Sequence, residues 1–163
     1  MKNKLYFCKK KKHMTEKFNK TDFNHSIPIQ IRFSDLDALN HVNNGFQCQY
    51  FDVGRIHYFR DALKRDIDWS KEFVVLVHID IDFLSPIMEK DKIFVESKLI
   101  EFGKKSMKMY QRIIDKENNI IKSTCYGILS GFDRDKNCSI PIPDEFKQAF
   151  IDYEHLSLAR QAI

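Results

Sequence analysis

The stretch RFSDLDALNHVNNGFQCQYFDVGR, residues 32–55, sets a dense group of polar side chains between two apolar segments. Those polar residues are Asp35, Asp37, His41, Asn43 and Asn44. A strand-like run precedes them and an aromatic-rich, helix-like run follows. Loops that carry this many hydrogen-bonding groups are common places for catalysis and binding. The stretch predicts a strand, a functional loop and a helix, in that order.

The two segments beside the loop have different periods. Residues 27–33 alternate apolar and polar, which predicts a half-buried strand with Ile27, Ile29, Ile31 and Phe33 on one face. Residues 45–64 place apolar side chains at helical spacing over most of the circumference, which predicts a helix buried on most sides. Asn43 or Asn44 suits the N-cap of this helix.

Four further strands are predicted, over residues 73–83, 93–101, 106–115 and 120–133. Short turns connect most of them, so we expect antiparallel neighbours. Pro143 with two acidic residues after it opens a short C-terminal helix. The predicted fold class is therefore α+β, a single domain in which a five-stranded antiparallel sheet wraps around one long central helix.

Composition limits the class of protein. The 163 residues are 43% hydrophobic and 31% charged, which fits one soluble domain with a real core. No run reaches the roughly 20 apolar residues of a membrane helix. Residues 1–20 hold eight lysines and one acid, while the rest of the chain has a net charge of −3. We expect a disordered basic tail over 1–24, a domain over 25–153, a C-terminal tail over 154–163, and no nucleic-acid partner.

The spacing of the cysteines bears on metal binding, and the N-terminal residues bear on the cellular compartment. The four cysteines, Cys8, Cys48, Cys125 and Cys138, are widely spaced, whereas zinc sites use paired ligands at short spacing. We therefore expect no metal. The first residues lack the apolar core of a secretory signal, which favours the cytoplasm and reduced thiols.

The polar stretch resembles the hotdog-fold acyl-CoA thioesterases, in particular the 4-hydroxybenzoyl-CoA thioesterase-like group. That family's pattern R-x-x-D-x-D-x-x-G-H-V-N-N is similar to residues 32–44, and its helix motif E-x-x-R is similar to Asp52–Arg55. The segments IDIDFLSPI (79–87), FGKKS (102–106) and SIPIPDEF (139–146) resemble later family segments. The resemblance covers residues 27–146 and implies a hotdog fold.

Four residues depart from the family pattern. Asn40 replaces a glycine, Leu36 a common threonine, Gln47 a frequent tyrosine, and Asp52 a glutamate. If the position of Asn40 needs a positive φ, asparagine is the next most tolerant residue after glycine.

The resemblance implies hydrolysis of an acyl-CoA to a free acid and coenzyme A, with no cofactor beyond the substrate's own coenzyme A. It places the catalytic carboxylate at Asp37, which can act on water as a general base or attack the thioester directly. A plain loop acid is the other interpretation of Asp37. We expect Asp35 to brace the loop by accepting from backbone N–H groups, or to pair with Arg32 or Arg55. Its closeness to Asp37 could raise the pKa of one of the two acids.

His41 is a second catalytic candidate, which could orient the loop, contact the thioester or place water; a purely structural histidine is the alternative. Asn43 and Asn44 could cap the helix or hold substrate and water. The oxyanion donor is left open between the helix N-terminus and a backbone amide within residues 73–77.

Lys104, Lys105 and Arg112 lie on or near a predicted hairpin and could meet the phosphates of coenzyme A, with plain surface residues as the alternative. Ser106, in the same hairpin, is a further candidate for substrate binding. We expect a homodimer or homotetramer, since a second copy covers an exposed strand edge. Acyl groups on acyl carrier protein are an alternative substrate, and a non-catalytic acyl-thioester-binding protein is an alternative function. The loop pattern argues against a hydratase.

Overall fold

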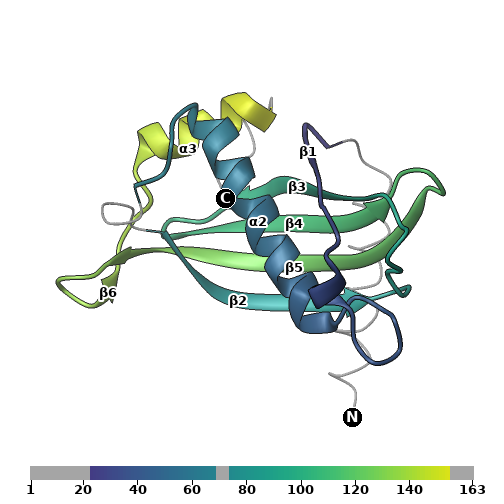
Figure 1. Ribbon diagram of the computed structural model, residues 1–163. Coiled ribbons are helices and arrows are strands. Elements are labelled where there is room, and N and C mark those ends of the chain that lie inside the picture. The colour runs from purple at the N-terminus through teal and green to yellow at the C-terminus, as the bar shows by residue number, and fades with distance from the viewer. Residues whose placement is uncertain (1–22, 69–73, 155–163) are drawn as a thin grey trace, which may run out of the picture.

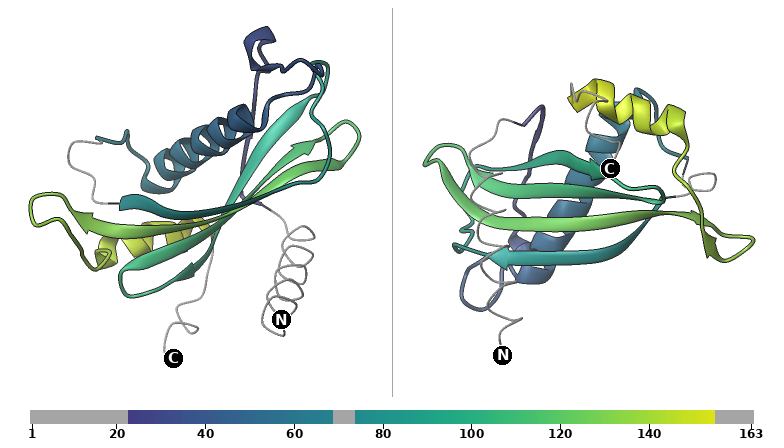
Figure 2. Two further views of the ribbon diagram at one scale, coloured as in Figure 1. Left: turned by 90° about the horizontal axis from the view of Figure 1, so that it is seen from below. Right: turned by 180° about the vertical axis from the view of Figure 1, so that it is seen from behind.

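A long helix lies across one face of a curved antiparallel sheet (Figures 1 and 2). The computed structural model describes residues 23–68 and 74–154. The expected basic tail, except for its last two residues, lies outside the described residues.

The elements follow in the order β1 (His25–Pro28), η1 (Phe33–Asp35), α2 (Asn44–Leu63), β2 (Val74–Phe83), β3 (Ile93–Phe102), β4 (Ser106–Asp115), β5 (Ile120–Asp133), β6 (Cys138–Ser139) and α3 (Asp144–Glu154). The strand order is β1-β3-β4-β5-β2, with β6 paired to β5, and every pairing is antiparallel. The predicted α+β fold is confirmed. The sheet has six strands rather than five, because the two-residue β6 is too short to show a sequence pattern.

The position of β2 differs from the expectation of sequential neighbours. β2 lies at one edge beside β5, and β3 lies between β4 and β1. The connection between β2 and β3, residues 84–92, crosses the end of the sheet instead of making a tight hairpin. Leu84 and Ser85 donate backbone hydrogen bonds to the carbonyl of Lys122 on β5, which holds the start of this crossing in place.

The first strand is shorter than predicted. β1 ends at Pro28, although Ile29 N still donates to Ile93 O at 3.0 Å. Ile29 and Ile31 pack against the core as predicted. Phe33 does not: it is 85% exposed, because the chain has turned into η1 and no longer alternates between the faces of the sheet.

The helix α2 begins and ends as the sequence predicts. Asn43 is the N-cap, and its side chain accepts from Gly45 N at 2.8 Å. The prediction that this helix is buried on most sides is wrong, since Asp52, Val53 and Arg60 are exposed. One stripe faces the sheet, and it includes two polar residues; its members are Gln47, Tyr50, Phe51, Gly54, Arg55, Tyr58, Phe59 and Ala62.

Gly54 allows α2 to approach the sheet closely. A Cβ built at this position would overlap the Cγ1 of Val95 on β3 and lie 3.2 Å from Gln111 Nε2 on β4. Glycine lowers helix propensity by about 1 kcal/mol relative to alanine. The helix carries this cost because no other residue leaves room for Val95 at this distance.

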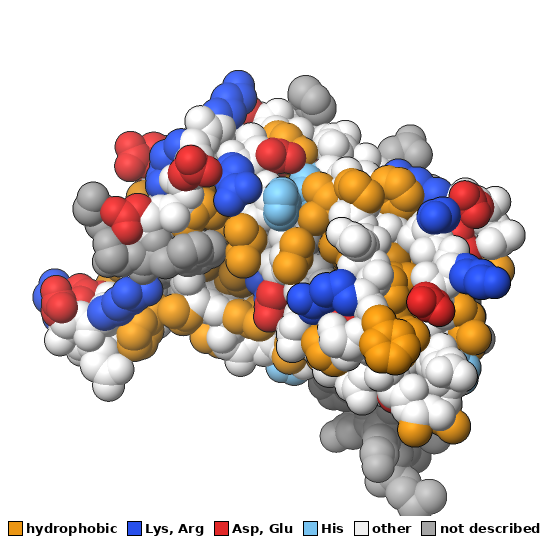
Figure 3. Space-filling model, in the orientation of Figure 1, with side chains coloured by type: hydrophobic (Ala, Val, Ile, Leu, Met, Phe, Trp, Pro, Cys, Tyr) orange, Lys and Arg blue, Asp and Glu red, His pale blue; other side chains and the backbone are white. Residues whose placement is uncertain are grey.

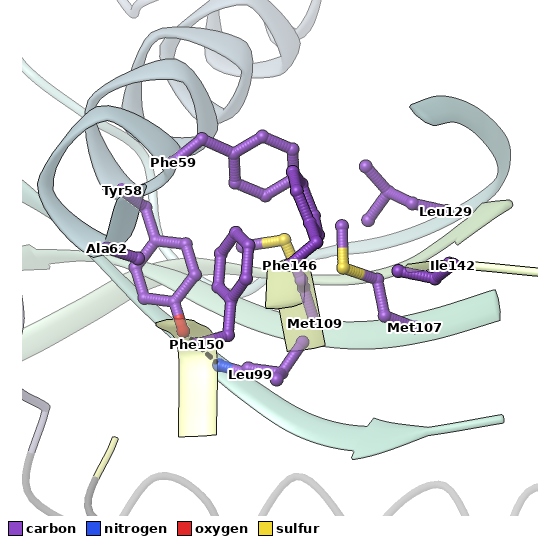
Figure 4. Close-up of a cluster of buried hydrophobic side chains, with 10 residues drawn as sticks. All are labelled: Tyr58, Phe59, Ala62, Leu99, Met107, Met109, Leu129, Ile142, Phe146 and Phe150. Carbon is purple, nitrogen blue, oxygen red and sulfur yellow. Dashed lines mark hydrogen bonds between the residues drawn. The ribbon is translucent and has the colours of Figure 1, made fainter. Parts of the chain in front are cut away.

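The core has two clusters. One packs the C-terminal half of α2 and the helix α3 against the sheet (Figure 4). There the hydroxyl of Tyr58 donates to Glu154 Oε1 at 2.6 Å and accepts from Leu99 N at 3.1 Å. Glu154 is buried, so it belongs to the fold rather than to the tail expected to begin at that residue. The second cluster lies under the N-terminal half of α2; its buried members are Val42, Tyr50, Phe51, Ile87, Ile93, Val95, Ile113 and Cys125.

His25 on β1 is a buried titratable group near the first cluster. Its ring packs edge-on against Tyr58 at 5.5 Å between centroids, and its Nε2 lies 3.8 Å from Asp61 Oδ2. Burial lowers the pKa of His25 to about 4, and the Asp61 carboxylate opposes this shift only in part. The fold therefore holds a neutral imidazole.

Replacing Gly54 with alanine should lower the free energy of unfolding by about 1–3 kcal/mol, the usual cost of overpacking, despite the gain in helix propensity. Urea unfolding of the wild type, Gly54→Ala, Val95→Ala and the double variant forms a complete cycle. We expect the double variant to be more stable than the sum of the single effects. Strict additivity would contradict the contact.

Acidification should destabilise the protein through His25. Because its pKa in the folded state is below that of an unfolded histidine, the unfolded chain binds more protons between pH 6.5 and 4. This contribution to stability is complete above pH 6.5 and is lost as the pH falls. We expect a loss of about 1–2 kcal/mol by pH 5, reduced by the nearby Asp61 charge. His25→Phe, compared with the wild type by urea unfolding at pH 7 and pH 5, should remove this part of the pH dependence.

Candidate functional site

The loop between η1 and α2 folds back on itself and on the β2–β3 connection. Isolated β-bridges join Leu36 to Val42 and His41 to Met88. Val42 N donates to Ile87 O at 2.9 Å, and Asp37 N donates to His41 O at 2.8 Å. The loop is therefore a hydrogen-bonded structure with a defined shape.

Asp37 lies at the turn of this loop and is partly exposed. Its Oδ1 accepts from Leu39 N at 2.8 Å and from His41 N at 3.2 Å. These contacts form an Asx-type turn, as the structural interpretation of this residue predicts. They occupy one carboxylate oxygen, Oδ1, and fix the orientation of the side chain.

Asn40 has a φ of 57°, in the left-handed region. The position does adopt a positive φ, which is the condition under which asparagine is the next most tolerant residue after glycine. Asn40 N donates to Asp37 O at 3.0 Å, which closes the turn directly after the acid.

Asp35 is fully buried beside the loop. Its carboxylate accepts from Tyr50 Oη at 2.6 Å and from the backbone N and Nε of Arg32, both at 3.0 Å. Burial opposes the charge, but the hydrogen bonds from Tyr50 and Arg32 outweigh it and hold the pKa of Asp35 below its usual value. The bracing role and the partner Arg32 are as predicted, whereas a raised pKa is wrong for this acid.

Two features of this brace differ from the sequence interpretation. Arg55 takes no part in it, because Arg55 pairs with Asp52 of the same helix and donates to Gln111 Oε1 at 3.3 Å. The role of Tyr50 was missed. It follows Asp35 by 15 residues, and only the return of the helix over the loop brings the two together.

The remaining loop residues have different surroundings. His41 joins the loop through its backbone, and its imidazole is partly exposed, with no hydrogen bond to any residue in the described part of the chain. Asn43 is confirmed as the cap. Asn44 is exposed, and its Oδ1 accepts from Gln47 Nε2 at 3.4 Å.

The amides at the start of α2 are largely engaged. Gly45 N donates to the Asn43 side chain, and Phe46 N and Gln47 N donate to Asn43 O. Of the alternative segment, residues 73–77, Phe73 lies outside the described residues. The oxyanion donor therefore remains a choice between these two places.

Lys104, Lys105 and Ser106 lie at the opposite end of the sheet from Asp37. They follow β3, whose first residue is near the Asp37 loop and whose ten residues span about 30 Å. Lys105 Nζ donates to Ser139 O at 2.7 Å. One chain does not bring these residues to the Asp37 loop.

Large apolar side chains reach the surface on the Asp37 loop and the nearby segments. Phe33 and Leu39 are 85% and 72% exposed. Phe83, Leu84 and Met88, at the start of the β2–β3 connection, are also exposed. Figure 3 shows hydrophobic side chains at the surface over η1 and the loop that follows it, at the lower right of the view. Exposed apolar groups gathered in this way are typical of a binding surface.

Two other kinds of site are absent from the residues that the structure describes. Across 23–68 and 74–154, no three His, Cys, Asp or Glu side chains are grouped so that they could hold a metal ion. None of the described helices combines the length and apolar character that crossing a membrane requires.

Comparison with known proteins shows which family and which solved structures this chain is similar to. Residues 31–150 match the thioesterase-like superfamily. A Thermus thermophilus thioesterase, solved with coenzyme A and zinc, is 27% identical with a TM-score of 0.74, over 83% of this chain and 98% of that one. The Synechocystis 1,4-dihydroxy-2-naphthoyl-CoA thioesterase Slr0204 is 16% identical with a TM-score of 0.71, over 78% and 96%, a likeness of fold alone.

YsmA of Bacillus subtilis is 26% identical over 91 residues, which are 56% of this chain and 61% of that protein. The match thus spans less than two thirds of that relative. Because the superfamily match covers most of the present chain, including the loop, α2 and the strands β2 to β5, the predicted family is confirmed. The chain belongs to the thioesterase-like superfamily and has the hotdog fold.

Proposed function

We propose that this protein hydrolyses acyl-CoA to a free acid and coenzyme A, with Asp37 as the reacting carboxylate. The observation that carries the proposal is the orientation and exposure of that side chain. Two backbone amides hold one oxygen, the group is partly exposed, and the loop is braced by a buried acid. A carboxylate in this setting has a defined orientation and is open to a substrate, as a base or nucleophile must be.

The chemistry follows from this arrangement. As a general base, Asp37 takes a proton from water while the water oxygen bonds to the thioester carbonyl carbon. The C–S bond then breaks, and the coenzyme A thiolate leaves and takes up a proton. As a nucleophile, the same carboxylate forms a mixed anhydride that water hydrolyses to the same products. His41 and Asn44, which are close in the chain and partly or fully exposed, would contact the thioester or the water.

The exposed apolar side chains around the loop support an apolar acyl group. Phe33 belongs to η1 and Leu39 to the loop that follows it, and Met88 is bridged to His41. An aliphatic or aromatic acyl chain would cover these side chains, whereas a short charged acyl group would leave them in water. The acyl carrier protein thioester presents the same acyl group, so a panel with both carriers separates the two substrates.

A second copy would bring the expected coenzyme A contacts to this site. β2 is an edge strand with exposed Leu76, Val77 and Ile79, a surface that favours pairing with another strand. Antiparallel pairing of two copies along β2 would place the far end of one sheet next to the Asp37 loop of the other. Lys104, Lys105 and Ser106 of the partner subunit would then reach the coenzyme A phosphates.

Asp37→Asn tests the assignment with little change of shape, because the amide oxygen still accepts from Leu39 N and His41 N. We expect kcat for acyl-CoA hydrolysis to fall at least about a hundredfold. Circular dichroism and the oligomeric state should stay as in the wild type. Asp144→Asn, an exposed acid on α3, is the matched control and should keep full activity. Turnover of Asp37→Asn close to that of the wild type would show that another group performs the reaction.

Asn40 should matter through its backbone. Asn40→Ala puts a residue with a Cβ and no compensating polar group at φ 57°, which should cost about 1 kcal/mol of stability and lower kcat. Asn40→Gly should keep both. Asn137→Ala, at φ 49° in the turn between β5 and β6, should lose similar stability and keep kcat. Equal kcat in the two alanine variants would mean that the Asn40 turn does not aim Asp37.

A further inference from the structure

A buried ion pair lies beside the segment that supports the Asp37 loop. Lys122 on β5 and Asp91 before β3 are 2.6 Å apart between Nζ and Oδ2, and their side chains are only 7% and 15% exposed. Burying two charges costs hydration, so such a pair adds little net stability compared with apolar side chains of similar volume. Its placement therefore suggests a role in fixing geometry.

Lys122 holds the β2–β3 connection with both its backbone and its side chain. Its carbonyl accepts from Leu84 N at 2.8 Å and Ser85 N at 2.9 Å. Its ammonium donates to Pro86 O at 3.1 Å. Three consecutive residues of the connection are thus tied to one residue of a central strand.

Asp91 closes the other side of the same segment. Its Oδ2 accepts from Met88 N at 2.9 Å, and its backbone N donates to Met88 O at 3.1 Å. The carboxylate therefore joins the Lys122 ammonium to the backbone at Met88. Ile87, between the two attachment points, is fully buried.

The segment fixed in this way is the one that contacts the Asp37 loop. Ile87 O accepts from Val42 N, and Met88 is bridged to His41. His41 in turn donates to Asp37 Oδ1 and accepts from Asp37 N. One ion pair, several hydrogen bonds and the short stretches of backbone between them thus connect the Lys122 ammonium to the reacting carboxylate.

We propose that Lys122 and Asp91 are positioning residues for Asp37. The pair touches neither Asp37 nor the expected place of the thioester. It acts by holding residues 86–88, to which the Asp37 loop is hydrogen-bonded and bridged. This proposal rests on the proposed function, since it concerns the aim of the same carboxylate.

The test variant is Lys122→Met with Asp91→Asn. It removes both charges together, so neither is left buried without a partner, and the asparagine oxygen can still accept from Met88 N. We expect kcat for acyl-CoA hydrolysis to fall at least tenfold, with KM within twofold, because small misplacements of a reacting group are costly. Lys122→Arg, which keeps the charge, should recover most of kcat. In the Asp37→Asn background the charge-free double substitution should cause no further loss.

A second readout does not depend on activity. Amide hydrogen exchange at Leu39 and His41, followed by NMR, should be faster in the charge-free variant and unchanged in the control Lys108→Met/Glu101→Gln. That control removes an exposed pair of 2.8 Å between β3 and β4. Wild-type kcat, or unchanged exchange at these two amides, in the charge-free variant would overturn the proposal. Full activity in Asp37→Asn would instead refute the proposed function. The exchange rates would still show whether the Lys122–Asp91 pair holds the loop.

Discussion

The close contact between α2 and β3 at Gly54 and Val95 sets the distance between the helix and the sheet. Because there is no Cβ at Gly54, the helix backbone comes near enough for polar side chains to reach across the interface. Gln111 of β4 donates to Phe51 O and to Ser97 Oγ, both at 3.0 Å, and accepts from Arg55. Buried polar groups need such partners. The Asn43 cap fixes where the helix begins, and therefore where the Asp37 loop ends.

The loop that enters this helix is held from two sides by different means. On the helix side, the buried Asp35 carboxylate receives hydrogen bonds from Tyr50 and Arg32, and its backbone carbonyl accepts from Asn43 N at 2.9 Å. On the sheet side, the support is backbone pairing to residues 87–88. A segment fixed on only one side could rotate about that attachment. Support on both sides leaves Asp37 one orientation, which is what catalysis by a preorganised group requires.

Local patterns in the sequence were sufficient for the elements but not for their partners. The strands β4 and β5 and the helix α2 begin and end within one residue of the prediction, because periodicity and caps act over a few residues. The place of β2 at the far edge was not predictable, since turn length alone does not report which strand lies beside which. Phe33 was assigned to the core because alternation was extended through a residue at which the chain turns. Arg55 was overlooked as a buried residue, because its partner Gln111 is far away in the sequence.

The motif draws attention to Asp37, but the motif alone does not say whether this acid forms a turn, reacts with substrate, or does both. From the sequence, a turn-forming Asp37 and a catalytic Asp37 were competing interpretations. In the structure the turn occupies only Oδ1, so the first interpretation does not exclude the second. The lysines expected to bind coenzyme A present the opposite case, because the motif order is kept while the geometry places them about 30 Å away along β3. Under the proposed function, either other residues bind the coenzyme A phosphates or a second chain supplies these lysines. The exposed apolar side chains on the edge strand β2 favour the second chain, since one antiparallel pairing would cover that edge and complete the site.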